Sequence, residues 1–171
     1  MEKHEENKAV AREGIASEAY VNISKAAWLT LCEDAYQRRH MEACGALLGR
    51  RDDQGNWHIT RAHPLRNIAS SPVYFEFDPQ ELLELELRYP GEMVGVYHSH
   101  PGGYARASST DRENMQRVNV EQCIPWVWLI AVGPFECPVT STVMLKAYHH
   151  YEDRGLVLVR VHLAEEAELQ P

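Results

Sequence analysis

The chain has 171 residues, 25% of them charged, with a formal net charge of −8 and a pI near 5.6. This length suits one domain with a full hydrophobic core and is short for two domains. The acidic balance and the lack of a basic cluster argue against nucleic acid as the main partner, because phosphate binding needs clustered lysine and arginine.

No apolar run is long enough to span a bilayer, and the N-terminal segment is charged, unlike a signal peptide. The four cysteines form no C-x-x-C pair, so we interpret them as small buried hydrophobic residues in a reducing compartment. They are Cys32, Cys44, Cys123 and Cys137. We therefore expect a cytoplasmic protein that does not engage membranes.

Residues 1–17 are polar and unpatterned, which predicts a flexible tail before a domain over residues 18–163. Residues 20–23 predict a short strand, and Ser24 then caps a helix. The apolar face of that helix has the spacing i, i+3, i+4, i+7. Its members are Trp28, Leu31, Cys32 and Ala35. Strands over 44–51 and 57–63 follow, joined as a hairpin by the turn at 52–55.

Residues 67–72 read as a polar loop and residues 73–77 as another short strand. A helix start follows, with Asp78 as N-cap, Pro79 as the first helical residue and Glu81 in the first turn. This helix is expected to run to about Arg88. Its acidic residues are interpreted as a solvated surface. They are Glu81, Glu84 and Glu86.

The apolar, β-prone run 93–97 places His98 and His100 at the end of a strand. Side chains two apart on a strand point to the same face, so both imidazoles can reach one metal ion. Pro101 closes the strand because it cannot donate to the ladder, and Gly102-Gly103 turns the chain back.

The segment 108–113 predicts a helix start with Thr110 as N-cap and Glu113 as its capping-box partner. Asp111 then lies in the first turn and faces the strand end. Two imidazoles and a carboxylate, with one position left for water, form the ligand set of a catalytic zinc. A structural site would fill all four positions, usually with cysteine. A His-x-His pair on a half-buried strand also occurs as a purely structural pair, and the added Pro, Ser and Asp favour the metal.

Residues 126–132 are almost all apolar and predict a central strand. Strands over 140–148 and 156–162 follow, and residues 164–171 form an acidic tail. The interleaving of strands with three helices indicates an α/β (α+β) domain around one mixed sheet. His149 and His150 are adjacent and face opposite sides of a strand, so they cannot chelate together. The remaining unpartnered histidines are expected to be solvated; these are His4, His58, His63 and His162.

The run His98-Ser99-His100-Pro101, followed by Ser108 and Asp111, matches the His-x-His-Pro and Ser-x-x-Asp pattern of the JAMM (MPN-plus) metalloproteases. The segment 42–49, which begins at Glu42, resembles the upstream glutamate segment of bacterial members. Residues 67–81 resemble the middle of those proteins, and the likeness covers roughly positions 20 to 145. His40-Met41 stands where relatives often have a proline or an acidic residue.

The resemblance implies a curved mixed sheet flanked by helices. It also implies that His98, His100 and Asp111 bind zinc, that water fills the fourth position and that Glu42 activates this water. Ser108 would stabilise the oxyanion. Only the resemblance singles out Glu42, which would otherwise be interpreted as a solvated residue at a helix end. Ser108 would otherwise be a helix-capping hydroxyl, a role that is compatible with catalysis.

By this resemblance the chain is expected to be an isopeptidase that cleaves a ubiquitin-like or sulfur-carrier protein from lysine, after the carrier's C-terminal Gly-Gly. A second reading is a peptidase that releases cysteine or another small amino acid from a sulfur carrier. A third is a non-catalytic scaffold, which retention of all five site residues disfavours. Similar domains also serve phage tails and cell walls, and the lack of a partnered wall-hydrolase domain disfavours such a role. Family members often pair, which leaves a homodimer open.

Overall fold

The computed structural model describes residues 18–136 and 143–165. The tail expected over 1–17 lies outside these residues. So do residues 166–171 of the expected acidic tail and residues 137–142, which include the expected start of the strand over 140–148. Among the described helices, none combines the length and the apolar character that a membrane crossing requires.

The described residues form seven strands that follow one another around a closed barrel in the order β1-β3-β2-β4-β5-β6-β7. The strands are β1 (Tyr20–Ser24), β2 (Cys44–Arg51), β3 (Trp57–Leu65), β4 (Met93–His100), β5 (Val127–Val132), β6 (Met144–Tyr151) and β7 (Gly155–Ala164). β1 is parallel to β3 and β7, and β4 is parallel to β5, whereas the other pairs are antiparallel. The expected mixed sheet is confirmed, and it curves far enough to close on itself.

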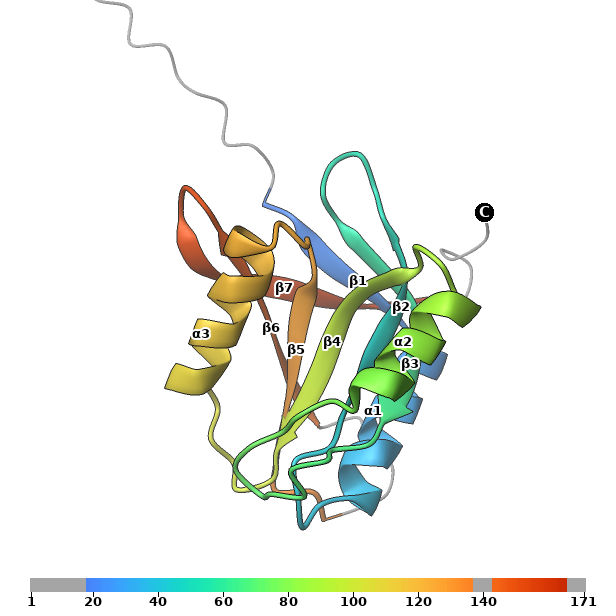
Figure 1. The fold of residues 1–171 in the computed structure, drawn as a ribbon, viewed down its shortest axis with the longest axis vertical. Helices are drawn as coiled ribbons and strands as arrows, with labels where there is room; N and C mark the ends of the chain where they lie inside the picture. Colours follow the sequence, from blue (N-terminus) through green and yellow to red (C-terminus); the bar gives the residue numbers. More distant parts are fainter. Residues whose placement is uncertain (1–17, 137–142, 166–171) are drawn as a thin grey trace, which may run out of the picture.

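Three helices lie against this sheet: α1 (Lys25–Gln37), α2 (Pro79–Arg88) and α3 (Ser109–Gln116), the last continued by a π-helical segment, η1 (Arg117–Glu121). The Ser24 hydroxyl accepts a 3.0 Å hydrogen bond from the Ala27 amide, and Asp78 accepts one of 2.9 Å from Gln80. Both expected N-caps are thereby confirmed. Figure 1 shows α3 beside β5 and β6, whereas α1 and α2 lie toward β2 and β3.

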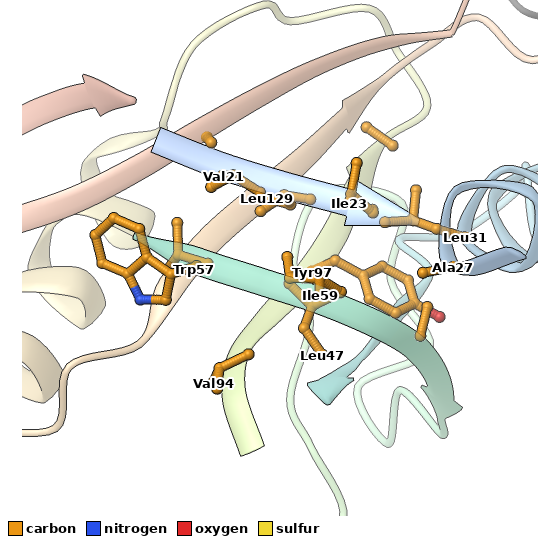
Figure 2. Packing of buried hydrophobic residues seen from close by; sticks show 14 of the residues in the cluster. Val21, Ile23, Ala27, Leu31, Leu47, Trp57, Ile59, Val94, Tyr97 and Leu129 are labelled. Carbon is orange, nitrogen blue, oxygen red and sulfur yellow. The ribbon is translucent and has the colours of Figure 1, made fainter. Parts of the chain in front are cut away.

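β5 is buried along its whole length, as its apolar sequence predicted. Val127, Leu129 and Ala131 belong to the inner cluster, together with Leu31 of α1. The alternate residues of β5 pack outward in a second cluster with Met115 of α3. Figure 2 shows the inner cluster, in which the Tyr97 ring reaches toward α1. The inner face is therefore filled by strand side chains against which α1 packs, and α3 covers the outer face of β5, so this strand is packed on both faces.

A partly buried polar network links the end of α1 to three strands. Arg38 forms a bidentate ion pair with Asp34, at 2.8 and 2.6 Å, and donates to the carbonyls of Cys44 and Leu65, each at 2.8 Å. The Tyr97 hydroxyl donates to Asp34 at 2.7 Å. Burial and the nearby Asp34 carboxylate raise the pKa of Tyr97 well above its ordinary value, so the hydroxyl stays a donor. The network holds the start of β2 beside β4.

Residues 73–77 do not form the expected strand. Its β-type pairing is limited to one isolated bridge, between Asn67 and Phe77. The apolar alternation in 73–77 predicted a strand, but the Asn67 side chain bonds the backbone of Tyr74 and Glu76 in place of a neighbouring strand. The segment 67–77 is therefore a loop with fixed internal hydrogen bonds.

Two further expectations about single side chains were wrong. His58 is not solvated alone, since its Nε2 atom lies 2.8 Å from an oxygen of Asp52. Cys123 is exposed and lies in an irregular segment with φ +55°, whereas Cys32 and Cys44 are buried as expected and Cys137 lies outside the described residues. The local sequence pattern indicates neither the contact of His58 with Asp52 nor the exposure of Cys123.

Replacing Gly45 with alanine should destabilise the fold by about 1–3 kcal/mol, the usual cost of overpacking a core. An added Cβ would lie 2.3 Å from the Tyr97 ring and 2.5 Å from the His63 carbonyl oxygen, so strand backbone would have to move. Urea unfolding measures the loss. Gly102→Ala is the matched control, because a Cβ there meets nothing within 4 Å. Equal stability of the two variants would contradict the prediction.

Candidate active site

The two motif histidines end β4 and are both buried, with His98 fully enclosed and His100 6% exposed. β4 lies between β2 and β5, with which it forms an antiparallel and a parallel ladder. The His100 carbonyl accepts hydrogen bonds from the amides of Gly103, at 3.0 Å, and Gly133, at 2.9 Å. Gly103 has φ +85°, which explains why a glycine stands in the turn after Pro101. The histidines therefore project from a well-anchored strand end.

Helix α3 begins two residues earlier than expected, so the cap assignment changes. Ser108, not Thr110, is the N-cap, and Asp111, not Glu113, completes the capping box. The Ser108 hydroxyl accepts from the Asp111 amide at 3.1 Å, and the Asp111 carboxylate accepts from the Ser108 amide at 2.8 Å. Both segments fit the capping-box pattern, and the sequence alone did not choose between them. The place of Asp111 in the first turn is confirmed.

The structure brings His98, His100 and Asp111 into one cluster. The two Nε2 atoms lie 3.2 Å apart, and each lies 3.2 Å from a different oxygen of the Asp111 carboxylate. Ligand atoms around a tetrahedral ion with bonds of about 2.0 Å are separated by about 3.3 Å. One ligand atom from each of the three residues falls within 4.8 Å of the others. The donor set and its spacing fit a zinc ion.

Hydrogen bonding fixes the imidazole orientation that such a cation needs. The Nδ1 atom of His100 lies 2.8 Å from the Tyr104 carbonyl oxygen, which can only accept, so Nδ1 carries the proton. The lone pair of Nε2 then faces the cluster. The His98 ring stacks on Phe75, with centroids 4.6 Å apart and an interplanar angle of 23°. This stacking holds the second imidazole in place, and its buried Nδ1 has no partner among the described residues.

The charges of the cluster favour a bound cation. Burial lowers the pKa of His98 and so favours the neutral imidazole that can act as a ligand. Burial alone would raise the pKa of Asp111, but its contacts with the imidazoles of His100 and His98 hold it well below its usual range. Burial alone would lower the pKa of His100, but the contacts with Asp111 and the Tyr104 carbonyl, together with the charges of Asp111 and Glu42, raise it. The negative field that stabilises a protonated imidazole here would equally stabilise a metal ion.

Glu42 lies on an irregular segment between α1 and β2 and is only 5% exposed. The reading of this residue as solvated is therefore wrong. Its amide donates to the Ser71 carbonyl at 2.8 Å, and its own carbonyl accepts from the Asn67 side chain at 3.0 Å. Burial raises the pKa of Glu42 to about 7, with His100 opposing and Asp111 reinforcing the shift. A carboxyl group with this pKa can both accept and release a proton near neutrality.

Glu42, His100 and Ser108 line one cleft of about 230 Å³. Its lining also includes Pro72 and Val73 from the loop 67–77 and Gly102 from the turn after β4. The sequence motif did not identify three further residues: Tyr104, which lines the cleft, Phe75, which stacks on His98, and Asn67, which bonds the Glu42 carbonyl. Tyr104 follows the expected turn directly, which was the one local signal for it. Asn67 and Phe75 reach the site only through the fold.

The chain belongs to the prokaryotic homologues of the JAB domain, whose family model matches residues 24–162. The resemblance to small JAMM-type proteins is thereby confirmed. A solution structure of a Desulfitobacterium hafniense protein has a similar fold, with a TM-score of 0.67 and 28% identity over 85% of this chain and 94% of that chain.

Two archaeal proteins named desampylases are similar over shorter segments. The Haloferax volcanii protein is 42% identical over 76 residues, and the Pyrococcus furiosus protein is 34% identical over 93 residues. These segments cover 42% and 53% of this chain and 52% and 59% of those proteins, so the chain spans little more than half of their length. Tail tip assembly protein K of Escherichia phage lambda is 40% identical over 55 residues, which are 32% of this chain and 24% of that protein.

Proposed function

We propose that this chain is a zinc-dependent isopeptidase. It hydrolyses the bond after the C-terminal Gly-Gly of a ubiquitin-like or sulfur-carrier protein conjugated to lysine. The observation that carries the proposal is the meeting of buried Glu42 and the Ser108 hydroxyl with the metal-type cluster of β4 and α3 in one cleft. The similarity to proteins named desampylases supports it.

Each site residue has a role in this proposal. His98, His100 and Asp111 would hold the zinc, which when bound lowers the pKa of water and polarises the substrate carbonyl. Glu42 accepts the proton of the attacking water and returns it to the leaving amine. The Ser108 oxygen accepts a hydrogen bond from the Asp111 amide, so its hydroxyl proton stays free. This proton can be donated to the carbonyl oxygen of the substrate as that oxygen gains negative charge.

The walls of the cleft favour a substrate with small side chains. Val73, which is 83% exposed, and Tyr104, which is 58% exposed, both line it, and Gly102 leaves backbone accessible beside His100. β4, which carries His98 and His100 to the cleft, is paired with β2 on one side and with β5 on the other, so it offers no free edge to a bound tail there. Backbone pairing with the tail therefore falls to the loop 67–77. A flexible tail that ends in Gly-Gly fits this path.

The test compares a carrier protein joined through Gly-Gly to a lysine side chain with the same fusion ending in Ala-Val. We expect cleavage directly after Gly-Gly, little cleavage of the Ala-Val fusion, and weak activity on short peptides, because much of the binding energy would come from the folded carrier. Equal rates on both fusions, or efficient cleavage of unfolded peptides, would indicate a general peptidase instead.

A third substrate separates the two carrier-directed activities. A carrier that ends in Gly-Gly-Cys, cleaved while the lysine conjugate stays intact, would replace the isopeptidase by the cysteine-releasing peptidase. Zinc-loaded protein that cleaves none of the substrates would indicate a scaffold.

Ser108→Ala is expected to lower kcat by about 10²–10³-fold, the usual loss for one oxyanion donor. Loss of the N-cap should also cost about 0.5–2 kcal/mol of stability. Ser24→Ala is the control, because Ser24 caps α1 through the same kind of bond, at 3.0 Å, without lining the cleft. Steady-state kinetics and thermal unfolding separate the two effects. An equal fall of kcat in both variants would assign Ser108 to capping alone.

A further inference from the structure

Asn67 is a buried side chain, 3% exposed, that uses all of its hydrogen-bonding capacity. Its amide nitrogen donates to the carbonyls of Glu42 and Tyr74, each at 3.0 Å. Its oxygen accepts from the amides of Ala69, at 3.0 Å, and Glu76, at 3.1 Å. One side chain therefore joins the segment of the expected general base to both halves of the loop 67–77.

No regular element holds Glu42 in place. It lies between α1 and β2 and belongs to neither, and neither of these elements hydrogen-bonds its backbone amide or carbonyl. The amide donates to the Ser71 carbonyl, and the carbonyl accepts from Asn67, so both bonds run to the loop 67–77. On the far side the next amide, of Ala43, donates to the Ser99 hydroxyl at 2.8 Å. The position of the Glu42 backbone thus depends on this loop.

The same loop touches the metal-type cluster and forms a wall of the cleft. Phe75 stacks on His98, and Val73 lines the cleft. The loop contains a tight turn in which Ser70 has φ +48° and its amide donates to the Asn67 carbonyl at 3.2 Å. Such a turn needs support from its surroundings, which the Asn67 side chain supplies.

We propose that Asn67 is a positioning residue that sets the place of Glu42 relative to the cluster of His98, His100 and Asp111. This inference rests on the proposed isopeptidase function for its kinetic consequence. Displacement of a reacting group by about 1 Å can lower a rate by about 10²-fold, so a bond to the Glu42 carbonyl bears directly on turnover. Asn67 does not line the cleft and acts through Glu42.

Asn67→Asp tests the inference, because the carboxylate keeps both acceptor bonds of the loop and loses both donor bonds, including the one to Glu42. Asn119→Asp is the matched control. Asn119 donates to the carbonyls of Ile124 and Trp126, each at 2.9 Å, and accepts from Trp128 and His150, away from the cleft. Both changes remove two donor bonds and add one charge.

We expect Asn67→Asp to keep about one zinc per chain and to lower kcat by about 10–10²-fold with KM nearly unchanged. Hydrogen exchange at the Glu42 amide should become faster. Asn119→Asp should change neither kcat nor hydrogen exchange at the Glu42 amide at temperatures where this variant is folded. Where Asn67→Asp does not fold, the uncharged variant Asn67→Ser is judged by the same criteria.

A kcat near the wild-type value in zinc-loaded Asn67→Asp would overturn the inference, as would an equal loss in Asn119→Asp. If the wild-type protein cleaves none of the fusions, the proposed function fails separately. Exchange at the Glu42 amide then still decides the positioning role, and an unchanged exchange rate in Asn67→Asp would refute it.

Discussion

Glu42→Gln should abolish most turnover while zinc stays bound. Glutamine has nearly the same shape and keeps the backbone bonds to Ser71 and Asn67, but its amide cannot accept the proton of the attacking water. Loss of a general base typically lowers kcat by about 10²–10⁴-fold. Kinetics on the Gly-Gly–lysine fusion measure the fall, and elemental analysis of the same sample measures the zinc.

Glu113→Gln provides the control for this variant. It makes the same chemical change on the exposed surface of α3, outside the cleft. It should therefore retain wild-type kcat. A zinc-loaded Glu42→Gln enzyme that turned over at the wild-type rate would remove Glu42 from the mechanism, whereas loss of zinc in that variant would make Glu42 part of the metal site.

Asp111→Asn should lose zinc. The change removes the one anionic ligand of the proposed set and leaves two imidazoles 3.2 Å apart. The loss of affinity should exceed the roughly 10–100-fold that follows removal of an outer partner of a metal ligand. The side-chain oxygen of asparagine can still accept from the Ser108 amide, so α3 should keep its start. Zinc titration against a chelating indicator measures the affinity.

Asp52→Asn is the matched control for metal binding. Asp52 also contacts an imidazole, that of His58, at 2.8 Å, but lies in the turn between β2 and β3. Its zinc affinity should equal that of the wild type. Wild-type affinity in Asp111→Asn itself would refute the proposed ligand set.

The elements with strong local signals were predicted well from the sequence. Ser24 and Asp78 each combine a capping side chain with a following helical pattern, and both caps are present. The closure of the sheet was not predicted, because it depends on the parallel pairing of β1 with β7, two strands far apart in the chain. The strand expected over 73–77 failed for a similar reason, since the Asn67 side chain satisfies its backbone in place of a neighbouring strand.

The residues of the proposed site also fall into two groups, those that local sequence patterns identify and those that only the fold brings to the site. His98, His100 and Asp111 were recognisable because strand period and helix start place them together within a short stretch. Glu42 enters from another segment, and only the family resemblance identified it. Phe75 and Asn67 carry no motif, since their stacking and hydrogen bonds arise from the path of the loop 67–77.

Closure of the barrel also limits how copies of this chain can associate. A sheet with an unpaired outer strand can extend into a neighbouring molecule and seed ordered aggregates. Here each described strand has two neighbours, so only parts of strands, such as the end of β3, lack a backbone partner on one side. Self-association is then expected to rely on side chains more than on backbone pairing. The most exposed apolar side chains of α2, Leu83 at 60% and Leu87 at 73%, are available for such contacts.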